Sequence, residues 1–122
     1  MKLFLLSVIT FLFIQTSNSQ EQVNSLPPGK YETVLKNQQN KWERGDIILL
    51  DQNKYKTSNS EETGEYRFSV TAQRVFFTSG PLRSIYAKTT LNNQTPVIVL
   101  PVAENEQLGM KLPSEIRGYL KQ

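Results

Sequence analysis

The stretch TGEYRFSVTAQRVFFTSGPL, residues 63–82, has the clearest hydrophobic pattern in the chain. Tyr66, Phe68 and Val70 alternate with polar or charged residues, and this period of two is typical of a half-buried strand. After the short connection TAQ, the segment RVFFTS at 74–79 has the composition of a returning strand. The stretch therefore predicts an antiparallel hairpin with one face in a hydrophobic core.

Further segments of the same kind occur on both sides of this hairpin. They are short, alternating or rich in β-branched residues, and bounded by turn-forming residues. They predict strands at 30–36, 46–51, 52–57, 84–90 and 96–102. The last of these reads PVIVLPV, which predicts a strand that is covered on both faces. About seven such strands indicate an all-β antiparallel meander, closed as a small barrel or folded as a sandwich, and barrel closure would remove exposed strand edges.

The tail at 104–122 allows two interpretations. Pro113 and the two residues after it favour the start of a short helix. Ile116, Gly118 and Leu120 instead alternate with polar or aromatic residues, as they would in a strand. We expect the strand, because a glycine disfavours a stable helix.

The first residues have the organisation of a secretory signal peptide. Lys2 precedes an apolar run at 3–14, and a polar stretch follows. The run is too short to span a bilayer as a helix, which takes about 20 apolar residues. Ser17 and Ser19 are the small residues expected before a cleavage site. The sequence therefore predicts a signal peptide at 1–19.

The remainder, residues 20–122, is expected to be a single β-rich domain with no stable membrane anchor after cleavage. The chain has no cysteine, whereas small secreted domains from oxidising compartments are commonly held by disulfides. This favours a bacterial exported protein, periplasmic or extracellular. The formal net charge is only +3 and the basic residues are scattered, so we expect no nucleic-acid partner.

Part of the chain, residues 45–82, resembles small exported bacterial β-rich proteins of unknown function. The resemblance rests on a Gly-x-Tyr-Arg-Phe strand at 64–68 and on a Phe-rich strand that ends in Ser-Gly-Pro at 79–81. Members of that group often end in a cysteine-containing strand, which is missing here. The resemblance implies export and a β-rich fold, and it implies no activity.

The residue types present exclude most catalytic chemistry. The chain has no histidine and no cysteine, which excludes imidazole-assisted nucleophiles and nearly all zinc, copper and iron–sulfur sites. Carboxylates remain, and a glycosidase needs two of them across a cleft. The candidate pairs are Asp46 with Asp51, Glu62 with Glu65, and Glu104 with Glu106. All lie in or beside predicted loops, as solvated charges do, so we expect no catalytic residue, no metal and no cofactor.

Two aromatic residues are candidates for contact with a ligand or partner. Trp42 lies in the polar segment NKWERGD. It is either an exposed stacking platform or a cap on one end of the core, and we expect the cap because large aromatic side chains are mostly buried. Phe76 faces outward if Val75 and Phe77 face the core. An outward phenylalanine is either covered by another element or part of a contact patch.

The sequence thus predicts an exported, non-catalytic β-domain that binds a protein, glycan or lipid or has a structural role. A second hypothesis is a proteinaceous inhibitor of a secreted enzyme that presents the loop at 58–64 or the loop at 78–84. A third is a small carboxylate-dependent hydrolase, which would require one of the acidic pairs to meet in a cleft.

Overall fold

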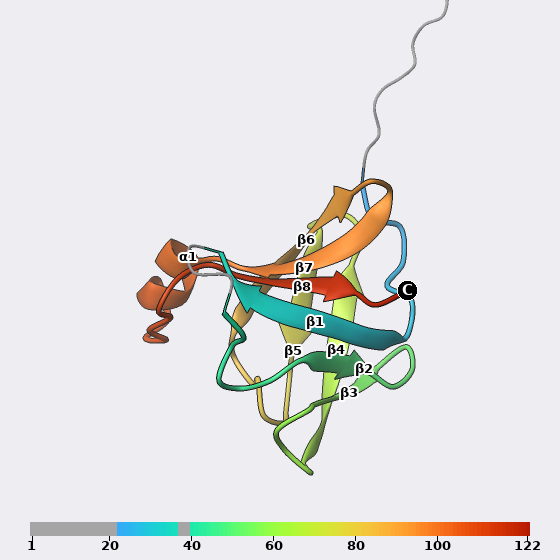
Figure 1. Ribbon diagram of the computed structural model, residues 1–122. Coiled ribbons are helices and arrows are strands. Elements are labelled where there is room, and N and C mark those ends of the chain that lie inside the picture. The colour runs from blue at the N-terminus through green and yellow to red at the C-terminus, as the bar shows by residue number, and fades with distance from the viewer. Residues whose placement is uncertain (1–21, 37–39) are drawn as a thin grey trace, which may run out of the picture.

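The computed structural model describes residues 22–36 and 40–122. Within these ranges the protein is a closed antiparallel barrel of eight strands with one short helix (Figure 1). The elements are β1 (Gly29–Leu35), β2 (Ile47–Leu49), β3 (Lys54–Thr57), β4 (Thr63–Ser69), β5 (Arg74–Phe77), β6 (Tyr86–Asn92), β7 (Thr95–Leu100), α1 (Val102–Gln107) and β8 (Ile116–Leu120). Each strand pairs with the next in the chain, and β8 closes the barrel on β1. The predicted signal peptide at 1–19 lies outside the described residues.

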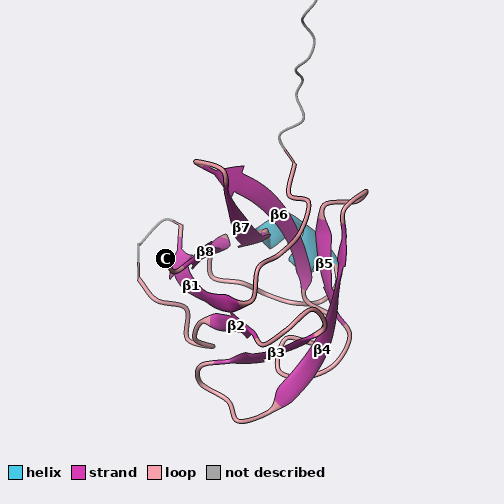
Figure 2. Ribbon diagram, turned by 90° about the vertical axis from the view of Figure 1, so that its right-hand side faces the viewer, coloured by secondary structure: helices cyan, strands magenta, loops and turns pink. Residues whose placement is uncertain are grey.

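The all-β prediction is confirmed, and of the two architectures the chain adopts the barrel (Figure 2). No helix in the described part of the chain is long and apolar enough to cross a membrane. The tail forms the expected strand as β8, which pairs with both β7 and β1. The short helix lies before it, at Val102–Gln107, rather than at Pro113.

A buried asparagine explains why α1 forms where it does. Asn105 is fully buried, and its side-chain oxygen accepts the N–H of Tyr86 at 2.7 Å. Its amide nitrogen donates to the carbonyl oxygens of Tyr86 at 3.0 Å and Pro101 at 2.7 Å. Asn105 thus replaces a strand partner for β6 at the point where β7 has already ended. Burial of the unpaired backbone of Tyr86 would otherwise be costly.

The hairpin of β4 and β5 follows its predicted pattern over most of its length. Tyr66 pairs with Phe77 and Phe68 pairs with Val75, and three of these four side chains are buried in the core. Phe68 is only partly buried, and Val70 is 36% exposed. The predicted core face therefore ends earlier than expected, because β4 stops at Ser69 and the chain turns there.

Both ends of the barrel are filled by side chains. Val23 and Leu26, from the segment before β1, are 1% and 3% exposed. Gln73 holds this segment: its Oε1 accepts the Val23 N–H at 2.9 Å, and its Nε2 donates to the Val23 carbonyl at 2.8 Å. At the opposite end, Trp42 and Leu82 are 4% and 0% exposed. One core cluster includes all four of these capping side chains.

Three buried tyrosines link this core to the rim of the barrel. Their rings are at most 1% exposed, and each hydroxyl donates to a backbone carbonyl. The acceptors are Pro27 for Tyr31 at 2.8 Å, Ser79 for Tyr55 at 2.7 Å and Asp51 for Tyr66 at 2.6 Å. This is the usual arrangement of a buried tyrosine, with an apolar body and a satisfied polar tip. The tyrosines therefore pack the interior and carry no exposed chemistry.

Candidate functional site

Because the interior is packed and both ends are capped, the outer face of the barrel is the place to look for a binding site. Phe76 lies there on β5 and is 38% exposed, so the prediction that it faces outward is confirmed. Its neighbours across the sheet are Arg67 on β4 and Tyr86 on β6. An exposed aromatic ring between such neighbours is a candidate contact surface.

Arg74 lies against both aromatic rings of this surface. Its guanidinium carbon is 4.4 Å from the ring centre of Phe76 and 4.0 Å from that of Tyr86. Both distances are within the range of attractive cation–π contacts. The side chains of Arg67, Arg74, Phe76, Tyr86 and Lys88 are called the aromatic–cation patch below. The contacts with the two rings hold the guanidinium of Arg74 in one position at the centre of the aromatic–cation patch.

The positive charge of this patch is not compensated. Arg74 lies directly opposite Lys88 across the β5–β6 ladder, and like charges in that position destabilise a sheet. Among the described residues, no carboxylate lies within ion-pair distance of Arg67, Arg74 or Lys88. The Nε of Arg74 is buried and has no hydrogen-bond partner in the described structure. An anion on this face would relieve the repulsion.

Trp42, the other aromatic candidate, is in a different position. It is 4% exposed and belongs to the core cluster. The guanidinium of Arg44 lies 5.9 Å from its ring centre. This burial agrees with the expected role as a cap at one end of the barrel. A stacking platform for a ligand needs an exposed ring face, which Trp42 does not offer in this structure.

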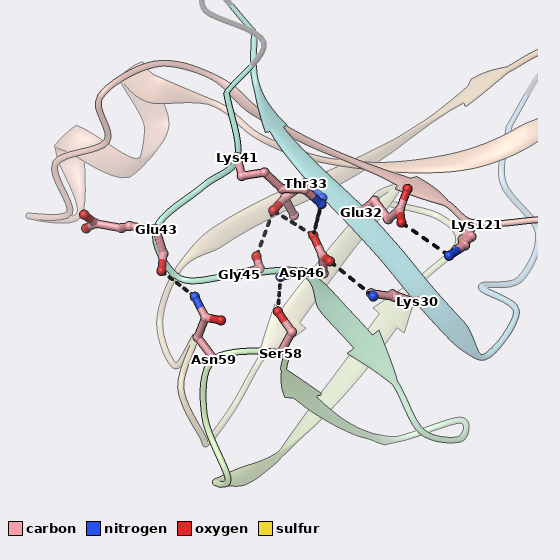
Figure 3. Close-up of polar contacts among 10 residues, drawn as sticks. All are labelled: Lys30, Glu32, Thr33, Lys41, Glu43, Gly45, Asp46, Ser58, Asn59 and Lys121. Atoms are coloured by element: carbon pink, nitrogen blue, oxygen red, sulfur yellow. Dashed lines mark hydrogen bonds and ion pairs between the residues drawn. The ribbon is translucent and has the colours of Figure 1, made fainter.

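Asp46 lies at the centre of a cluster of polar contacts, which Figure 3 shows. Its carboxylate accepts the N–H of Thr33 at 3.0 Å and lies 3.4 Å from Lys41 Nζ and 3.7 Å from Lys30 Nζ. It sits just before β2, where the β1–β2 ladder has ended and the N–H of Thr33 needs an acceptor. The cluster therefore links β1 to the residue before β2 at the point where the backbone pairing of the two strands has ended.

The surroundings of Asp46 determine how its carboxyl group titrates. Burial of the carboxylate raises its pKa, but the Thr33 N–H and the ammonium groups of Lys41 and Lys30 outweigh this effect. The pKa of Asp46 therefore lies below its ordinary value of 3.8. A carboxyl group with a lowered pKa stays ionised at neutral pH and is poorly suited to act as a general acid.

We expect Asp46→Asn to lower the free energy of unfolding by about 1–3 kcal/mol at pH 7, because the amide loses the charge-assisted contacts. Because the pKa of Asp46 is lower in the folded protein than in the unfolded chain, its ionisation stabilises the fold, and this stabilisation is fully present at pH values above the unfolded-state pKa. This contribution is lost as the pH falls through the folded pKa. Urea melts of both proteins from pH 7 to pH 2.5 measure it. The difference between them should shrink in acid, and a constant difference would contradict the assigned role.

The three predicted acidic pairs lie in three different parts of the fold. Asp46 and Asp51 lie at opposite ends of β2, and the side chain of Asp51 accepts backbone N–H groups of its own turn. Glu65 lies on β4, where it pairs with Lys54 at 3.7 Å, and Glu62 belongs to the preceding loop. Glu104 and Glu106 both belong to α1. Among the described residues, no group of three or more acidic side chains could hold a metal ion.

The loop at 78–84, one candidate for an inhibitory loop, is tied to the barrel. Leu82 is fully buried, and its N–H donates to the Tyr55 hydroxyl at 2.8 Å. Arg44 donates to the Pro81 carbonyl at 3.0 Å. The loop at 58–64 is also anchored at its start, because Ser58 Oγ accepts the N–H of Asp46. The longest exposed run in the two loops is at 61–63, between Ser60 and the buried Gly64.

Sequence reasoning identified Phe76 but missed the other members of the aromatic–cation patch. Arg74 is two residues from Phe76, so the alternation of a strand places both on the same face. That signal was available in the sequence. The contact of Arg74 with Tyr86 depends on the register of β5 against β6. The sequence does not specify this register, because the loop that connects the two strands is several residues long.

Comparison of the chain with protein-family models, with curated proteins and with solved structures found no match. A proposal about function therefore rests on the sequence and on the physical properties of the described residues.

Proposed function

We propose that this protein is an exported, non-catalytic binding module that holds a carboxylate-rich segment of a partner protein on its aromatic–cation patch. The observation that carries the proposal is the uncompensated Arg74–Lys88 pair, held beside two aromatic rings. Export rests on the signal-peptide pattern at 1–19. The packed interior supports an outer-face mode of binding, since a ligand inside the barrel would have to displace core side chains.

The geometry of Arg74 favours a carboxylate as the group that is bound. A guanidinium that stacks on aromatic rings keeps its edge free for two parallel N–H···O bonds to a planar oxyanion. Lys88 adds a second charge across the ladder, and Arg67 adds a third beside Phe76. Because the ring contacts already restrict Arg74, less side-chain entropy is lost when a ligand binds.

Titration with a hexaglutamate peptide, followed by backbone amide NMR shifts, tests the proposal. We expect the shifts to map to β4, β5 and β6 and to weaken when salt is added. Arg74→Lys keeps the charge but loses the planar fork and the ring stacking. It should weaken binding about tenfold, which corresponds to about 1.4 kcal/mol.

A matched pair of lysine variants separates local recognition from general charge attraction. Lys88→Gln and Lys111→Gln remove the same charge from two exposed side chains, of which only Lys88 belongs to the patch. Binding should weaken with Lys88→Gln and stay within about twofold of the unmodified protein with Lys111→Gln. Equal losses in the two variants, or shifts that map away from the patch, would overturn the proposed function.

A further inference from the structure

A proline creates a second feature on the outside of the barrel. β7 pairs with β8 from Val97 to Leu100, and the ladder does not extend to Pro96. Proline has no backbone N–H to donate to a neighbouring strand. Beyond this point Leu120 pairs only with β1, through Tyr31. The two strands therefore separate, and the β6–β7 hairpin continues past the end of β8 (Figure 1).

The separation leaves a cleft with a volume of about 190 Å³. One wall comes from the β6–β7 hairpin and the other from the end of β8 and the residues after it. The lining residues are Asn92, Asn93, Thr95, Val97, Tyr119, Leu120 and Gln122. The volume corresponds to about six water molecules, at about 30 Å³ for each in the liquid. The cleft therefore suits one small ligand or one unit of a longer chain.

The Tyr119 hydroxyl in the lining is hydrogen-bonded to the guanidinium of Arg117, whereas the other polar side chains of the cleft are neutral and have no partner among the described residues. Asn92, Asn93, Thr95 and Gln122 supply amides and a hydroxyl, and none of these side chains hydrogen-bonds to another described residue. Amides offer both donors and acceptors, which a ligand with several hydroxyl groups can use together. The lining contains no aspartate, glutamate, lysine or arginine.

The apolar groups of the cleft complete the pattern. Val97 faces outward on β7, where Tyr119 is its cross-strand neighbour on β8. Val97 is 1% exposed, so the apolar surface open to a ligand comes from the partly exposed Tyr119 rather than from Val97. The Tyr119 side chain points to the same outer side, because it alternates with the inward Gly118. An aromatic side chain next to amides suits a ring that has apolar C–H faces and polar edges.

From this juxtaposition we infer that the cleft binds a neutral pyranose, either free or as a unit of a glycan. A pyranose presents hydroxyl groups around its edge and C–H groups on its faces, which matches the two kinds of lining. The positive φ angles of Asn93 and Gln94, 52° and 67°, fix the two-residue turn that carries one wall. This site is separate from the aromatic–cation patch and does not depend on it.

Amide NMR titration of the full mature chain with methyl α-glucopyranoside, methyl β-galactopyranoside and N-acetylglucosamine tests this inference. At least one sugar should give saturating shifts at 92–95 and 119–122. Asn92→Ala removes one lining amide from an exposed position and should weaken that binding about fivefold, as expected for the loss of a hydrogen bond. Asn53→Ala, on the exposed β2–β3 turn, should leave it unchanged.

Galacturonate provides a test of the neutral character of the cleft. It keeps the ring and the ring hydroxyl groups of galactose but has a carboxylate in place of the C6 hydroxymethyl group, and none of the residues that line the cleft is a lysine or arginine. It should therefore bind no better than the galactoside at the cleft. Preferred binding of galacturonate there, the absence of saturating shifts with all three neutral sugars, or equal effects of Asn92→Ala and Asn53→Ala would overturn the inference. None of these results bears on binding of hexaglutamate at the aromatic–cation patch.

Discussion

Replacing Trp42 by alanine is expected to lower the free energy of unfolding by about 3–5 kcal/mol. The ring is 4% exposed and belongs to the cluster that fills the barrel. Its removal leaves a cavity at one end of the core, and a cavity costs stability in addition to the lost apolar burial. Urea unfolding, followed by circular dichroism, measures the change in both proteins.

The fluorescence of the unmodified protein gives an independent measurement. Trp42 is the only tryptophan in the chain, so the emission reports on one site. It should be blue-shifted in the folded protein and should not change when hexaglutamate or a sugar is added. Trp42→Phe keeps much of the packing and should cost clearly less than Trp42→Ala. Red-shifted emission together with an unchanged urea midpoint for Trp42→Ala would identify an exposed platform instead.

The sequence predicts the strands of this barrel well, because each has a local signal. In β4 and β5, alternation alone identifies Tyr66, Val75 and Phe77 as core residues and Phe76 as an outward residue. Alternation is a property of the strand itself, so no knowledge of distant partners is required. The limit appears at Val70, where the pattern continues but the strand has already ended.

The ends of the barrel are harder to predict, because their burial depends on contacts between distant residues. Val23 is buried through hydrogen bonds with Gln73, fifty positions further along the chain. The helix α1 has six residues, which is too short for a periodic signal, and Asn105 gains its role only from the free backbone of Tyr86.

The candidate sites show the same division between local and distant information. The outward direction of Phe76 follows from alternation, whereas the position of Arg74 between two rings requires the β5–β6 register. The cleft requires the knowledge that β8 is the neighbour of Pro96, because only then does the missing N–H separate two strands. Barrel closure brings these residues together, and it is a property of the whole chain.

The second large effect concerns Gly80, in the Ser-Gly-Pro segment that ends the hairpin. Gly80 has a φ of 89°, and a Cβ built there would lie 2.9 Å from the backbone nitrogen of Gly64 and 2.9 Å from the Tyr55 hydroxyl. That hydroxyl binds the Ser79 carbonyl and the Leu82 N–H, which hold the loop on the barrel. We expect Gly80→Ala to cost about 3 kcal/mol or more, from left-handed backbone strain and from overpacking together.

Gly109→Ala is the matched control for this substitution. Gly109 has nearly the same φ, 85°, but a Cβ there would meet no atom within 4 Å. Its replacement should therefore cost only the backbone strain, about 1–2 kcal/mol. The difference between the two variants in urea melts isolates the close approach of Gly80 to Gly64. Equal costs would show that the loop at 78–84 can shift to accommodate the added methyl group, and Gly80 and Gly109 would then be needed only for their positive φ angles. A larger cost at Gly80 would mean that the close contact between Gly64 and Gly80 stabilises the β4–β5 hairpin together with the loop at 78–84.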